Sequence, residues 1–538
     1  MPVYDSLYYY KDRVRHILVR HEQGAIHAAQ GYARAGKGTG VVIVTSGPGA
    51  TNVITGVADA MTDSTPVVVI TGQVSTAALG TDAFQEADVI GLTAPISKWN
   101  YQIRTADEVA WAVARAFYIA RTGRPGPVVL DFTKDAQVGM TDFRFEPCSF
   151  IRSYIPDPKI SDQAVNKAVA LLDAAERPFV VFGQGILLSG AEKELRAFLE
   201  KGDIPAGSTM LGLSALPSGF PLYRGMIGMH GNVAPNRMTN ECDVLVAVGM
   251  RFDDRVTGTV STYARQAKVI HIDIDPSEIG KIIPVEAGIR GDAKKVLKIL
   301  TEKMQERRHP EWNAGFDRCD AVERAKVIDP EVHPGSGMLR MGEVVDRVVS
   351  AFDGQAIVVT DVGQNQMMGA RYSHFRESRS FISSGGLGTM GFGLPAAIGA
   401  KVACPGRPVC LFVGDGGIQM TLQEFGTIMQ EGIGVKIILL NNNWLGNVRQ
   451  WQQLFFGHRY SETRMLNPDY AMIAKAYGIN CVSVDSREAL EPALKAMTAD
   501  AHPFLLDVHV MEEGNVMPMV PPGKGIHEIM ITESEWYS

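Results

Sequence analysis

The sequence predicts an α/β protein with three doubly wound parallel-sheet domains, and three observations support this fold class. Short apolar runs alternate with helical patterns along most of the chain, as expected for parallel strands joined by crossover helices. The chain has 538 residues, a length typical of about three domains. Two stretches without this alternation, residues 143–162 and 307–334, are interpreted as linkers between three segments.

The first segment, residues 1–145, is predicted to form one domain. A helix is expected at the start, followed by a strand over residues 15–19. An alanine-rich helix should run from Glu22 to Ala35, and the turn Ser46–Asn52 should open another helix. Buried-type strands are expected at the following positions: 41–45, 66–71 and 128–131.

The second segment, residues 160–305, is predicted to be a central domain, and the third covers residues 337–515 with a C-terminal tail, 516–538. In the second we expect a helix at 162–175 and strands at 178–182, 244–248 and 269–274. In the third we expect strands at 409–413 and 435–440 with a helix, 421–430, between them.

The composition excludes several classes of protein. Hydrophobic residues make up 46% and charged residues 21%, as in globular proteins. The net charge of −7 indicates no nucleic-acid partner, and apolar runs such as residues 67–70 are too short to cross a membrane. Six scattered cysteines lack metal-ligand spacing, and the N-terminus lacks a signal-peptide pattern. A cytoplasmic location is therefore expected.

The most informative motif joins Gly414-Asp415-Gly416-Gly417 to Asn442, 27 positions beyond Asp415 (442 minus 415). Each half alone is usually only a turn or a loop. Across a strand–helix–strand unit, however, both would lie at the carboxyl edge of one parallel sheet. A carboxylate and an amide oxygen suit Mg²⁺, and glycines let backbone N–H groups approach phosphate oxygens. The pair therefore predicts a magnesium–diphosphate site.

Several other residues have both a structural and a functional interpretation. Glu22 is either a helix-start acid favoured by the helix dipole or a base beside a cofactor ring. Gln85 is either a polar loop residue or a hydrogen-bond partner of a reacting oxygen. The stretch Arg251–Gly258 is either a solvated loop with internal ion pairs or a phosphate- and ribose-binding loop. Trp451 is either part of a buried aromatic stripe or the wall of a substrate pocket.

These motifs together resemble the catalytic large subunit of acetohydroxyacid synthase (acetolactate synthase), a family of thiamine-diphosphate-dependent enzymes. The stretch Arg251–Gly258 is the most discriminating, because it resembles the FAD-binding stretch of that family. The resemblance covers nearly the whole chain and also rests on these motifs: His21–Ala25, Ser46–Asn52, Thr71–Val74, Gly123–Pro127, Gly228–Gly231, Ser384–Gly391, Met420–Glu424 and Gly446–Phe456.

The resemblance implies three cofactors, thiamine diphosphate, Mg²⁺ and FAD, with pyrimidine-binding, FAD-binding and diphosphate-binding domains in that order. FAD would have a structural role and would not be redox-active during turnover. The implied metal ligands are Asp415, Asn442 and the backbone carbonyl of Trp444. The other implied thiamine-diphosphate residues are Glu22, Val362, Gly363, Gln364, Asn365, Gly388, Met390, Gly414, Gly416, Gly417, Met420, Leu445 and Gly446. The implied FAD residues are Arg124, Gly183, Gln184, Gly185, Thr209, Met210, Met229, His230, Gly249, Arg251, Asp253, Asp273, Ile274, Asp292 and Ala293.

The resemblance also implies an activity. The enzyme would decarboxylate pyruvate and transfer the hydroxyethyl unit to a second pyruvate or to 2-ketobutyrate, the first common step of branched-chain amino-acid biosynthesis. Glu22 would activate the cofactor, while Gln85, Arg255 and Trp451 would complete the catalytic set; Arg255 would pair with the acceptor carboxylate. The implied assembly is a homodimer or tetramer, in which Glu22 faces thiamine diphosphate held by another subunit, with a regulatory small subunit.

Two departures from the family pattern leave alternatives open. Family members carry further N-terminal residues, including a first strand and a Gly-Gly turn, so the first domain is expected to lack its N-terminal strand. Asn447 stands where methionine is common. The alternatives are a non-catalytic or impaired truncated chain that binds cofactors, or another FAD-containing thiamine enzyme, such as pyruvate oxidase or glyoxylate carboligase. Glyoxylate carboligase is disfavoured by the presence of Glu22, and pyruvate oxidase by Arg255 and Trp451.

Overall fold

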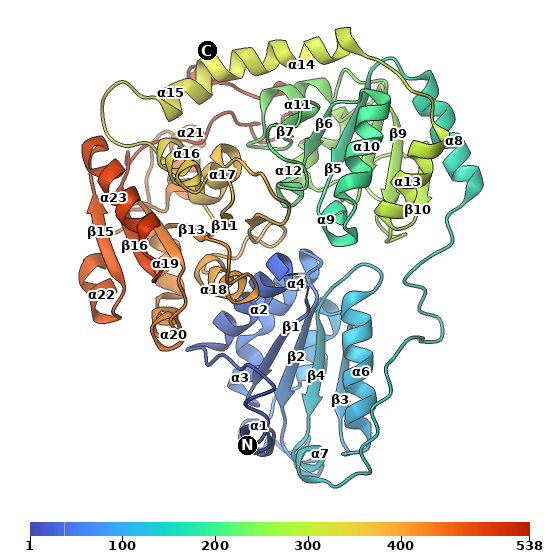
Figure 1. Cartoon of the computed structure of the whole chain (residues 1–538), viewed down its shortest axis with the longest axis vertical. Coiled ribbons are helices and arrows are strands. Elements are labelled where there is room, and N and C mark those ends of the chain that lie inside the picture. The colour runs from blue at the N-terminus through green and yellow to red at the C-terminus, as the bar shows by residue number, and fades with distance from the viewer. Residues whose placement is uncertain (37, 538) are drawn as a thin grey trace.

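Three parallel sheets follow one another along the chain, as Figure 1 shows. The computed structural model describes residues 1–36 and 38–537. The strand orders are β1-β2-β4-β3, β10-β9-β8-β5-β6-β7 and β12-β11-β13-β14-β16-β15. Every ladder in these sheets is parallel, with helices in most of the connections. The predicted fold class is therefore confirmed.

The first sheet has β1 and β3 at its edges, with β2 and β4 between them. Its strands are β1 (Gly40–Val44), β2 (Val67–Gly72), β3 (Trp99–Ile103) and β4 (Val128–Phe132). The helices of this part are α1 (Pro2–Tyr8), α2 (Glu22–Gly36), α3 (Pro48–Asn52), α4 (Ile54–Thr62), α5 (Val89–Thr93), α6 (Glu108–Arg121) and α7 (Lys134–Val138). The strand predicted over residues 15–19 is absent: this segment is mostly exposed coil and pairs with no strand of the sheet.

The second sheet is the core of the central segment. Its strands are β5 (Pro178–Phe182), β6 (Ala206–Ser208), β7 (Tyr223–Met226), β8 (Val244–Val248), β9 (Lys268–Asp273) and β10 (Ala287–Arg290). Its helices are α8 (Asp162–Ala174), α9 (Gly185–Ser189), α10 (Glu192–Gly202), α11 (Val233–Met238), α12 (Asp254–Thr257) and α13 (Ala293–Lys303). β5 and β8 are buried over their whole length, as expected for strands covered on both faces.

The third sheet carries the Asp415 and Asn442 motifs. Its strands are β11 (Ile357–Thr360), β12 (Phe381–Ile382), β13 (Val409–Gly414), β14 (Lys436–Asn441), β15 (Asn480–Val484) and β16 (Phe504–His509). Its helices are α16 (Met341–Ala351), α17 (Gln364–Tyr372), α18 (Gly393–Ala403), α19 (Asp415–Met420), α20 (Phe425–Glu431), α21 (Gly446–Phe455), α22 (Tyr470–Ala476), α23 (Arg487–Ala499) and α24 (Ser534–Tyr537).

One predicted linker is wrong and the other is as expected. Residues 143–160 contain no helix or strand. Residues 307–334, however, form α14 (Pro310–Glu323), a π-helical turn and α15 (Asp329–Val332). Their charges suggested an irregular stretch because they cover the exposed face of a helix whose Trp312 and Phe316 are buried.

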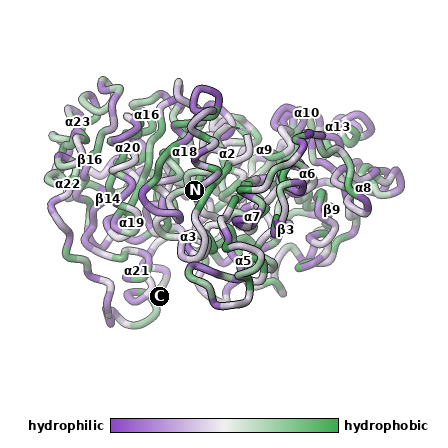
Figure 2. The backbone as a smooth tube through the Cα atoms, turned by 90° about the horizontal axis from the view of Figure 1, so that it is seen from below, coloured by the Kyte–Doolittle hydropathy of each residue, from purple (hydrophilic) through white to green (hydrophobic). Residues whose placement is uncertain are grey.

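The hydropathy-coloured tube in Figure 2 has α8, α10 and α13 at one end and α22 and α23 at the other.

Helices α2 and α18 join the first and third segments by direct backbone packing. A Cβ atom at Gly31 would lie 2.0 Å from the carbonyl oxygen of Ala396. A Cβ atom at Gly399 would lie 1.8 Å from the carbonyl oxygen of Ala28. Because both distances are far below van der Waals contact, only glycine fits at either position, and the two helices lie in close contact.

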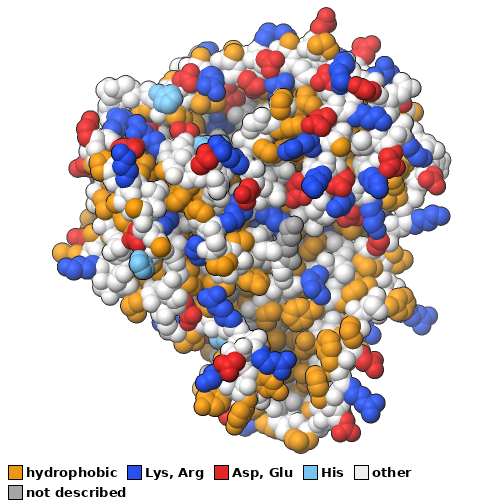
Figure 3. Space-filling model, in the orientation of Figure 1, with side chains coloured by type: hydrophobic (Ala, Val, Ile, Leu, Met, Phe, Trp, Pro, Cys, Tyr) orange, Lys and Arg blue, Asp and Glu red, His pale blue; other side chains and the backbone are white. Residues whose placement is uncertain are grey.

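The surface in Figure 3 is mixed in charge over the upper part and richer in hydrophobic side chains at the lower end, which the first sheet occupies. Large exposed apolar side chains include Tyr9, Met140 and Phe143. Within the described ranges, no helix is long and apolar enough to cross a bilayer.

Candidate active site

Asp415 and Asn442 follow two neighbouring parallel strands. β13 and β14 pair in register from Cys410 with Lys436 to Gly414 with Leu440, so both residues lie at the carboxyl edge of the sheet. Asp415 is 1% exposed and Asn442 is 3% exposed. The structure thus brings together the two halves of the predicted metal motif at the place where open α/β sheets bind ligands.

Asn467, which no sequence pattern indicated, holds this edge together. Its Nδ2 atom lies 2.7 Å from Asp415 Oδ2, 3.0 Å from Asn441 Oδ1 and 3.2 Å from Asn443 Oδ1. The Tyr470 hydroxyl donates to the backbone carbonyl of Asp415 at 3.1 Å. Asn467 is 52 positions from Asp415 in the sequence and lies outside any regular element, so only the folded chain identifies it.

The loop after β14 is held in place by two hydrogen bonds from its backbone. The Trp444 N–H donates to Asn442 Oδ1 at 3.3 Å, and the Leu445 N–H donates to the carbonyl oxygen of Thr463 at 2.8 Å. Among the residues described, no group of three or more His, Cys, Asp or Glu side chains could hold a metal ion. A cation here would therefore depend on one carboxylate, an amide oxygen and a backbone carbonyl, a hard oxygen set that fits Mg²⁺.

Glycines near this edge are closely packed against neighbouring side chains. A Cβ atom at Gly417 would lie 2.5 Å from Asp361 Oδ1, and one at Gly446 would lie 2.2 Å from Gln364 Oε1, so side chains are excluded there. Asn365 is 5% exposed, and its Oδ1 atom has no hydrogen-bond partner within the structure. Burial raises the pKa of Asp415 to about 6, and a bound cation would favour its ionised form.

The candidate residues of the first sheet also converge. Glu22 begins α2, and its Oε2 atom accepts a hydrogen bond from Asn52 Nδ2 at 3.0 Å. Gln85 has a φ of +63° and packs on the Ser46–Asn52 turn: a Cβ atom at Gly47 would lie 2.8 Å from Gln85 Cα. The structure therefore places Gln85 and Glu22 against the same turn.

Glu424 connects this region to the third sheet within one chain. It lies in the short helix η6 (Leu422–Glu424), four residues after Met420, and is fully buried. Its Oε1 atom accepts the N–H groups of Arg20 at 3.2 Å and His21 at 3.0 Å, directly before Glu22. Sequence reasoning missed this role, because the contact joins residues 403 positions apart.

A crevice of about 1220 Å³ lies beside the second sheet and reaches toward the third. This volume exceeds the range of about 300–1,000 Å³ that is usual for drug-sized ligands. All fifteen residues predicted for FAD line it, from Arg124 to Ala293. The crevice is also lined by residues predicted for thiamine diphosphate and for catalysis, namely Val362, Gly363, Gly388, Arg255 and Trp451.

The floor of this crevice is formed by close backbone contacts and flanked by ion pairs. A Cβ atom at Gly185 would lie 2.5 Å from Gly249 Cα. Arg124 pairs with Asp275 at 3.2 Å and with Glu278 at 2.8 Å.

The side chain of Arg255 is 63% exposed. It therefore has no buried counterion to displace before it could bind a substrate carboxylate.

The half-buried carboxyl of Asp273 predicts a pH effect. Burial at the end of β9 raises its pKa from 3.8 to about 6. A carboxyl whose pKa is raised in the folded state contributes stability below its unfolded pKa and loses it as the pH rises through the folded pKa. In Asp273→Asn, we expect the fall in the free energy of unfolding between pH 4 and pH 6 to shrink by about 1–2 kcal/mol.

Urea denaturation of the flavin-free protein at several pH values measures this effect. The exposed Asp162, at the start of α8, provides the control: Asp162→Asn should keep the pH slope of the unmodified chain. A slope in Asp273→Asn equal to that of the unmodified chain would show that Asp273 is not the group responsible.

The fold and the two half-sites together define a thiamine-diphosphate-dependent enzyme. Three family descriptions match in chain order. "Thiamine pyrophosphate enzyme, N-terminal TPP binding domain" matches residues 1–92, the central domain matches 165–300, and the C-terminal TPP binding domain matches 361–508. Each matched range lies inside one of the three predicted domains.

Sequence identity to curated relatives identifies one family within this class of enzymes. The chain is 43% identical to the acetolactate synthase large subunit of Lactococcus lactis over 97% of this chain and 90% of that protein. It is 44% identical to the isozyme 2 large subunit of Escherichia coli, over 98% and 94% respectively. It is 43% identical to the large subunit of Corynebacterium glutamicum, over 98% and 86%. The chain belongs to the acetolactate synthase large-subunit family.

Proposed function

We propose that this chain is the catalytic subunit of an acetolactate synthase that joins the two-carbon unit of pyruvate to a second pyruvate or to 2-ketobutyrate. One observation carries the proposal. A single crevice is bordered by the thiamine-site residues Val362, Gly363 and Gly388 and by Arg255 and Trp451, which suit an acceptor keto acid. The names of the relatives, acetolactate synthase large subunits, support the same reaction.

The residues at the Asp415 edge fit thiamine diphosphate with Mg²⁺. Asp415, Asn442 and the Trp444 carbonyl would hold the cation, and the glycine turn would accept the diphosphate. When bound, thiamine diphosphate supplies a nucleophilic carbon that adds to a keto group and accepts the electron pair released with carbon dioxide. Met420 is 55% exposed beside Gly391 and would contact the ring system of the cofactor.

The reaction needs a proton donor and acceptor at the pyrimidine ring, and Glu22 suits this role. Its carboxyl would hold and return a proton at a ring nitrogen, and the hydrogen bond from Asn52 would fix its orientation. Arg255 would bind the carboxylate of the acceptor, and Gln85 would hydrogen-bond a reacting oxygen. Trp451, whose ring centroid lies 5.0 Å from that of Phe455, would contact the acceptor's alkyl group.

The crevice fits FAD as a further, structural cofactor. Its volume, its glycine contacts and its arginines match a dinucleotide: backbone can approach a pyrophosphate at Gly183–Gly185, and Arg251 can pair with it. Asp273 and Asp292 could accept hydrogen bonds from hydroxyl groups of the ligand. Bound FAD would be expected to raise the melting temperature without changing redox state during turnover.

The assembly proposed is a homodimer or a tetramer with a regulatory small subunit. The relatives are named large subunits, which implies such a partner. In the dimer, Glu22 of one subunit would face thiamine diphosphate on the other subunit. The pathway proposed is the synthesis of valine, leucine and isoleucine.

Acetolactate formation from pyruvate tests the proposed function. The purified chain, supplied with thiamine diphosphate, Mg²⁺ and FAD, is expected to release carbon dioxide and acetolactate in equal amounts without an electron acceptor. Flavin reduction coupled to pyruvate consumption would instead indicate a pyruvate oxidase. A folded, cofactor-loaded chain without product would support the non-catalytic alternative.

Trp451 is expected to set the choice of acceptor. Trp451→Leu removes much of the apolar surface that would contact the extra methylene of 2-ketobutyrate, so its preference over pyruvate should fall about 3- to 10-fold. The measurement is the ratio of the two products from mixed substrates. Trp111→Leu, on the surface of α6, is the matched control and should keep the ratio. An unchanged ratio in Trp451→Leu would exclude the pocket-wall role.

A further inference from the structure

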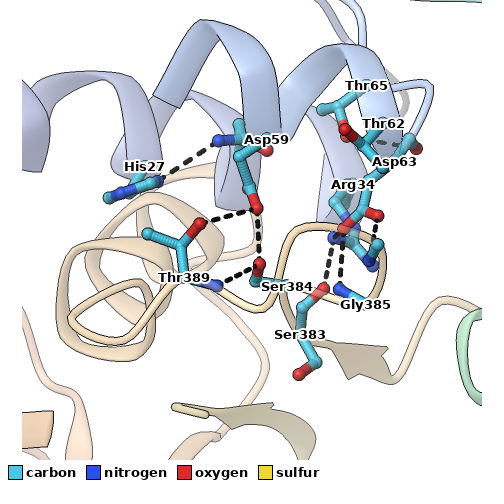
Figure 4. Close-up of polar contacts among 12 residues, drawn as sticks. His27, Arg34, Asp59, Thr62, Asp63, Thr65, Ser383, Ser384, Gly385 and Thr389 are labelled. Atoms are coloured by element: carbon cyan, nitrogen blue, oxygen red, sulfur yellow. Dashed lines mark hydrogen bonds and ion pairs between the residues drawn. The ribbon is translucent and has the colours of Figure 1, made fainter. Parts of the chain in front are cut away.

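A buried polar cluster joins the first segment to the loop before α18. Asp59 and Asp63, at the C-terminal end of α4 and just beyond it, face the loop that runs from Ser383 to Thr389, as Figure 4 shows. Arg34 of α2 completes the cluster. The side chain of Asp63 is 0% exposed and that of Arg34 is 6% exposed. The cluster belongs neither to the metal edge nor to the residues that line the crevice floor.

Asp63 contacts the loop with both carboxylate oxygens. Oδ2 accepts the N–H of Gly385 at 2.9 Å, and Oδ1 accepts the N–H of Gly386 at 2.7 Å. Arg34 Nη1 lies 3.3 Å from Asp63 Oδ2 and donates to the carbonyl oxygen of Ser383 at 2.6 Å. Three residues of the loop, Ser383, Gly385 and Gly386, are therefore held by one ion pair.

Asp59 fixes the next part of the same loop. The Ser384 hydroxyl donates to Asp59, and the Thr389 hydroxyl donates to Asp59 Oδ1 at 3.1 Å. The Thr389 N–H donates to Ser384 Oγ at 2.8 Å, which closes the loop on itself. Both ends of the glycine-rich stretch are thus tied to the first segment.

The opposite side of the loop faces the proposed cofactors. Gly385, Leu387 and Gly388 are exposed, and all three line the large crevice. A Cβ atom at Gly386 would lie 2.9 Å from Arg251 Nη2 on one side and 2.9 Å from Asp63 Oδ1 on the other. The loop is therefore a thin layer between the buried cluster and the crevice, and a shift of Asp63 would move the crevice wall.

We propose that Asp63, with Asp59 and Arg34, positions the Ser384–Met390 loop so that Gly388 and Met390 meet thiamine diphosphate. The first segment of a chain then has a second task besides providing Glu22: it shapes the cofactor site of its own third segment. The inference rests on the proposed placement of thiamine diphosphate at Gly388 and Met390. Burial raises the pKa of both aspartates, which agrees with a cluster that depends on its N–H donors and Arg34.

The test is Asp63→Asn. This substitution keeps the shape of the side chain, but it replaces one carboxylate oxygen, which accepts a backbone N–H of the loop, with an amide NH2 group that can only donate. We expect thiamine diphosphate with Mg²⁺ to bind about tenfold more weakly or worse, the effect of losing one charge-assisted hydrogen bond. Amide hydrogen exchange of residues 384–391 in the cofactor-free protein should become faster. Titration calorimetry and exchange mass spectrometry measure the two effects without an activity assay.

Asp131→Asn is the matched control, because Asp131 is equally buried in β4 but contacts only Thr71, Gln73 and Gln102 of its own segment. The Asp131→Asn substitution should lower the free energy of unfolding without changing the affinity for thiamine diphosphate or the rate of amide hydrogen exchange in the loop. Ser384→Ala removes the Asp59 contact and should reproduce the effect if Asp63→Asn does not fold.

Affinity and loop exchange equal to those of the unmodified chain, in a folded Asp63→Asn or Ser384→Ala protein, would overturn the inference. Equal weakening in Asp131→Asn would also overturn it, because the effect would then follow stability alone. An unmodified chain that binds thiamine diphosphate but forms no acetolactate would contradict the proposed function, while the binding comparison would still decide the role of Asp63.

Discussion

Replacing Asp415 with asparagine is expected to weaken Mg²⁺-dependent binding of thiamine diphosphate at least about 100-fold, or about 2.7 kcal/mol. The substitution keeps the volume and the contact with Asn467 but removes the one carboxylate at the edge of β13 and β14. The protein would then offer the divalent cation only neutral oxygen ligands, which hold it much more weakly than a carboxylate does. Acetolactate formation should fall in proportion at low cofactor concentration.

The control must distinguish the loss of a metal ligand from the loss of stability that follows when a buried acid is neutralised. Asp131→Asn neutralises a buried aspartate whose pKa is likewise raised by burial, but far from the proposed metal edge. It should bind thiamine diphosphate as the unmodified chain does. If Asp415→Asn kept the same Mg²⁺ dependence as Asp131→Asn, Asp415 would not be a metal ligand.

Replacing Glu22 with glutamine is expected to lower acetolactate formation about 100- to 10,000-fold, while the affinity for thiamine diphosphate changes only a few-fold. Glutamine keeps the size of the side chain and can still contact Asn52, but it cannot exchange a proton with the pyrimidine ring. Steady-state rates and titration calorimetry separate the two quantities. Glu108→Gln, at the start of α6, is the control and should keep full activity. Undiminished activity in Glu22→Gln would remove Glu22 from the catalytic set.

Mixing the two impaired variants at low cofactor concentration tests whether one site uses two chains. In a heterodimer of Glu22→Gln and Asp415→Asn, a shared-site geometry leaves one site with both original residues. Random reassociation should then restore about a quarter of the activity. No recovery in mixtures whose heterodimers are verified by mass would show that each site is built within one chain.

The fold class was predictable because several of the central strands are continuous apolar runs. β13 and β14 are buried on both faces, so their boundaries were predicted within one or two residues. Eight strands of the three sheets were not predicted: β3, β6, β7, β10, β11, β12, β15 and β16. The pattern of β3 is weak because Trp99, Asn100 and Tyr101 are only half-buried, and β6 is too short to show a period because it covers only Ala206–Ser208. The strand expected at residues 15–19 has an apolar pattern but no neighbouring strand to pair with, and pattern alone cannot supply one.

The candidate site was predictable only where its chemistry is local in sequence. Asp415 and its glycines lie in one turn, and the predicted FAD residues lie in short motifs after strands. Asn467, Glu424 and Asp63 were missed, because each acts on a segment that is distant along the chain. Their side-chain types are ordinary for loops and helix ends, and only tertiary contacts give them a role.

The glycine contacts between α2 and α18 have a consequence for synthesis of the protein. Gly31 and Gly399 are 368 positions apart (399 minus 31), so the ribosome needs about 20–70 s to make the second helix after the first. During that time the small, apolar face of α2 has no partner and is free to associate wrongly. Folding of this chain in cells is therefore expected to be limited by late docking of its first and third segments, and to benefit from chaperones that cover α2 until α18 emerges.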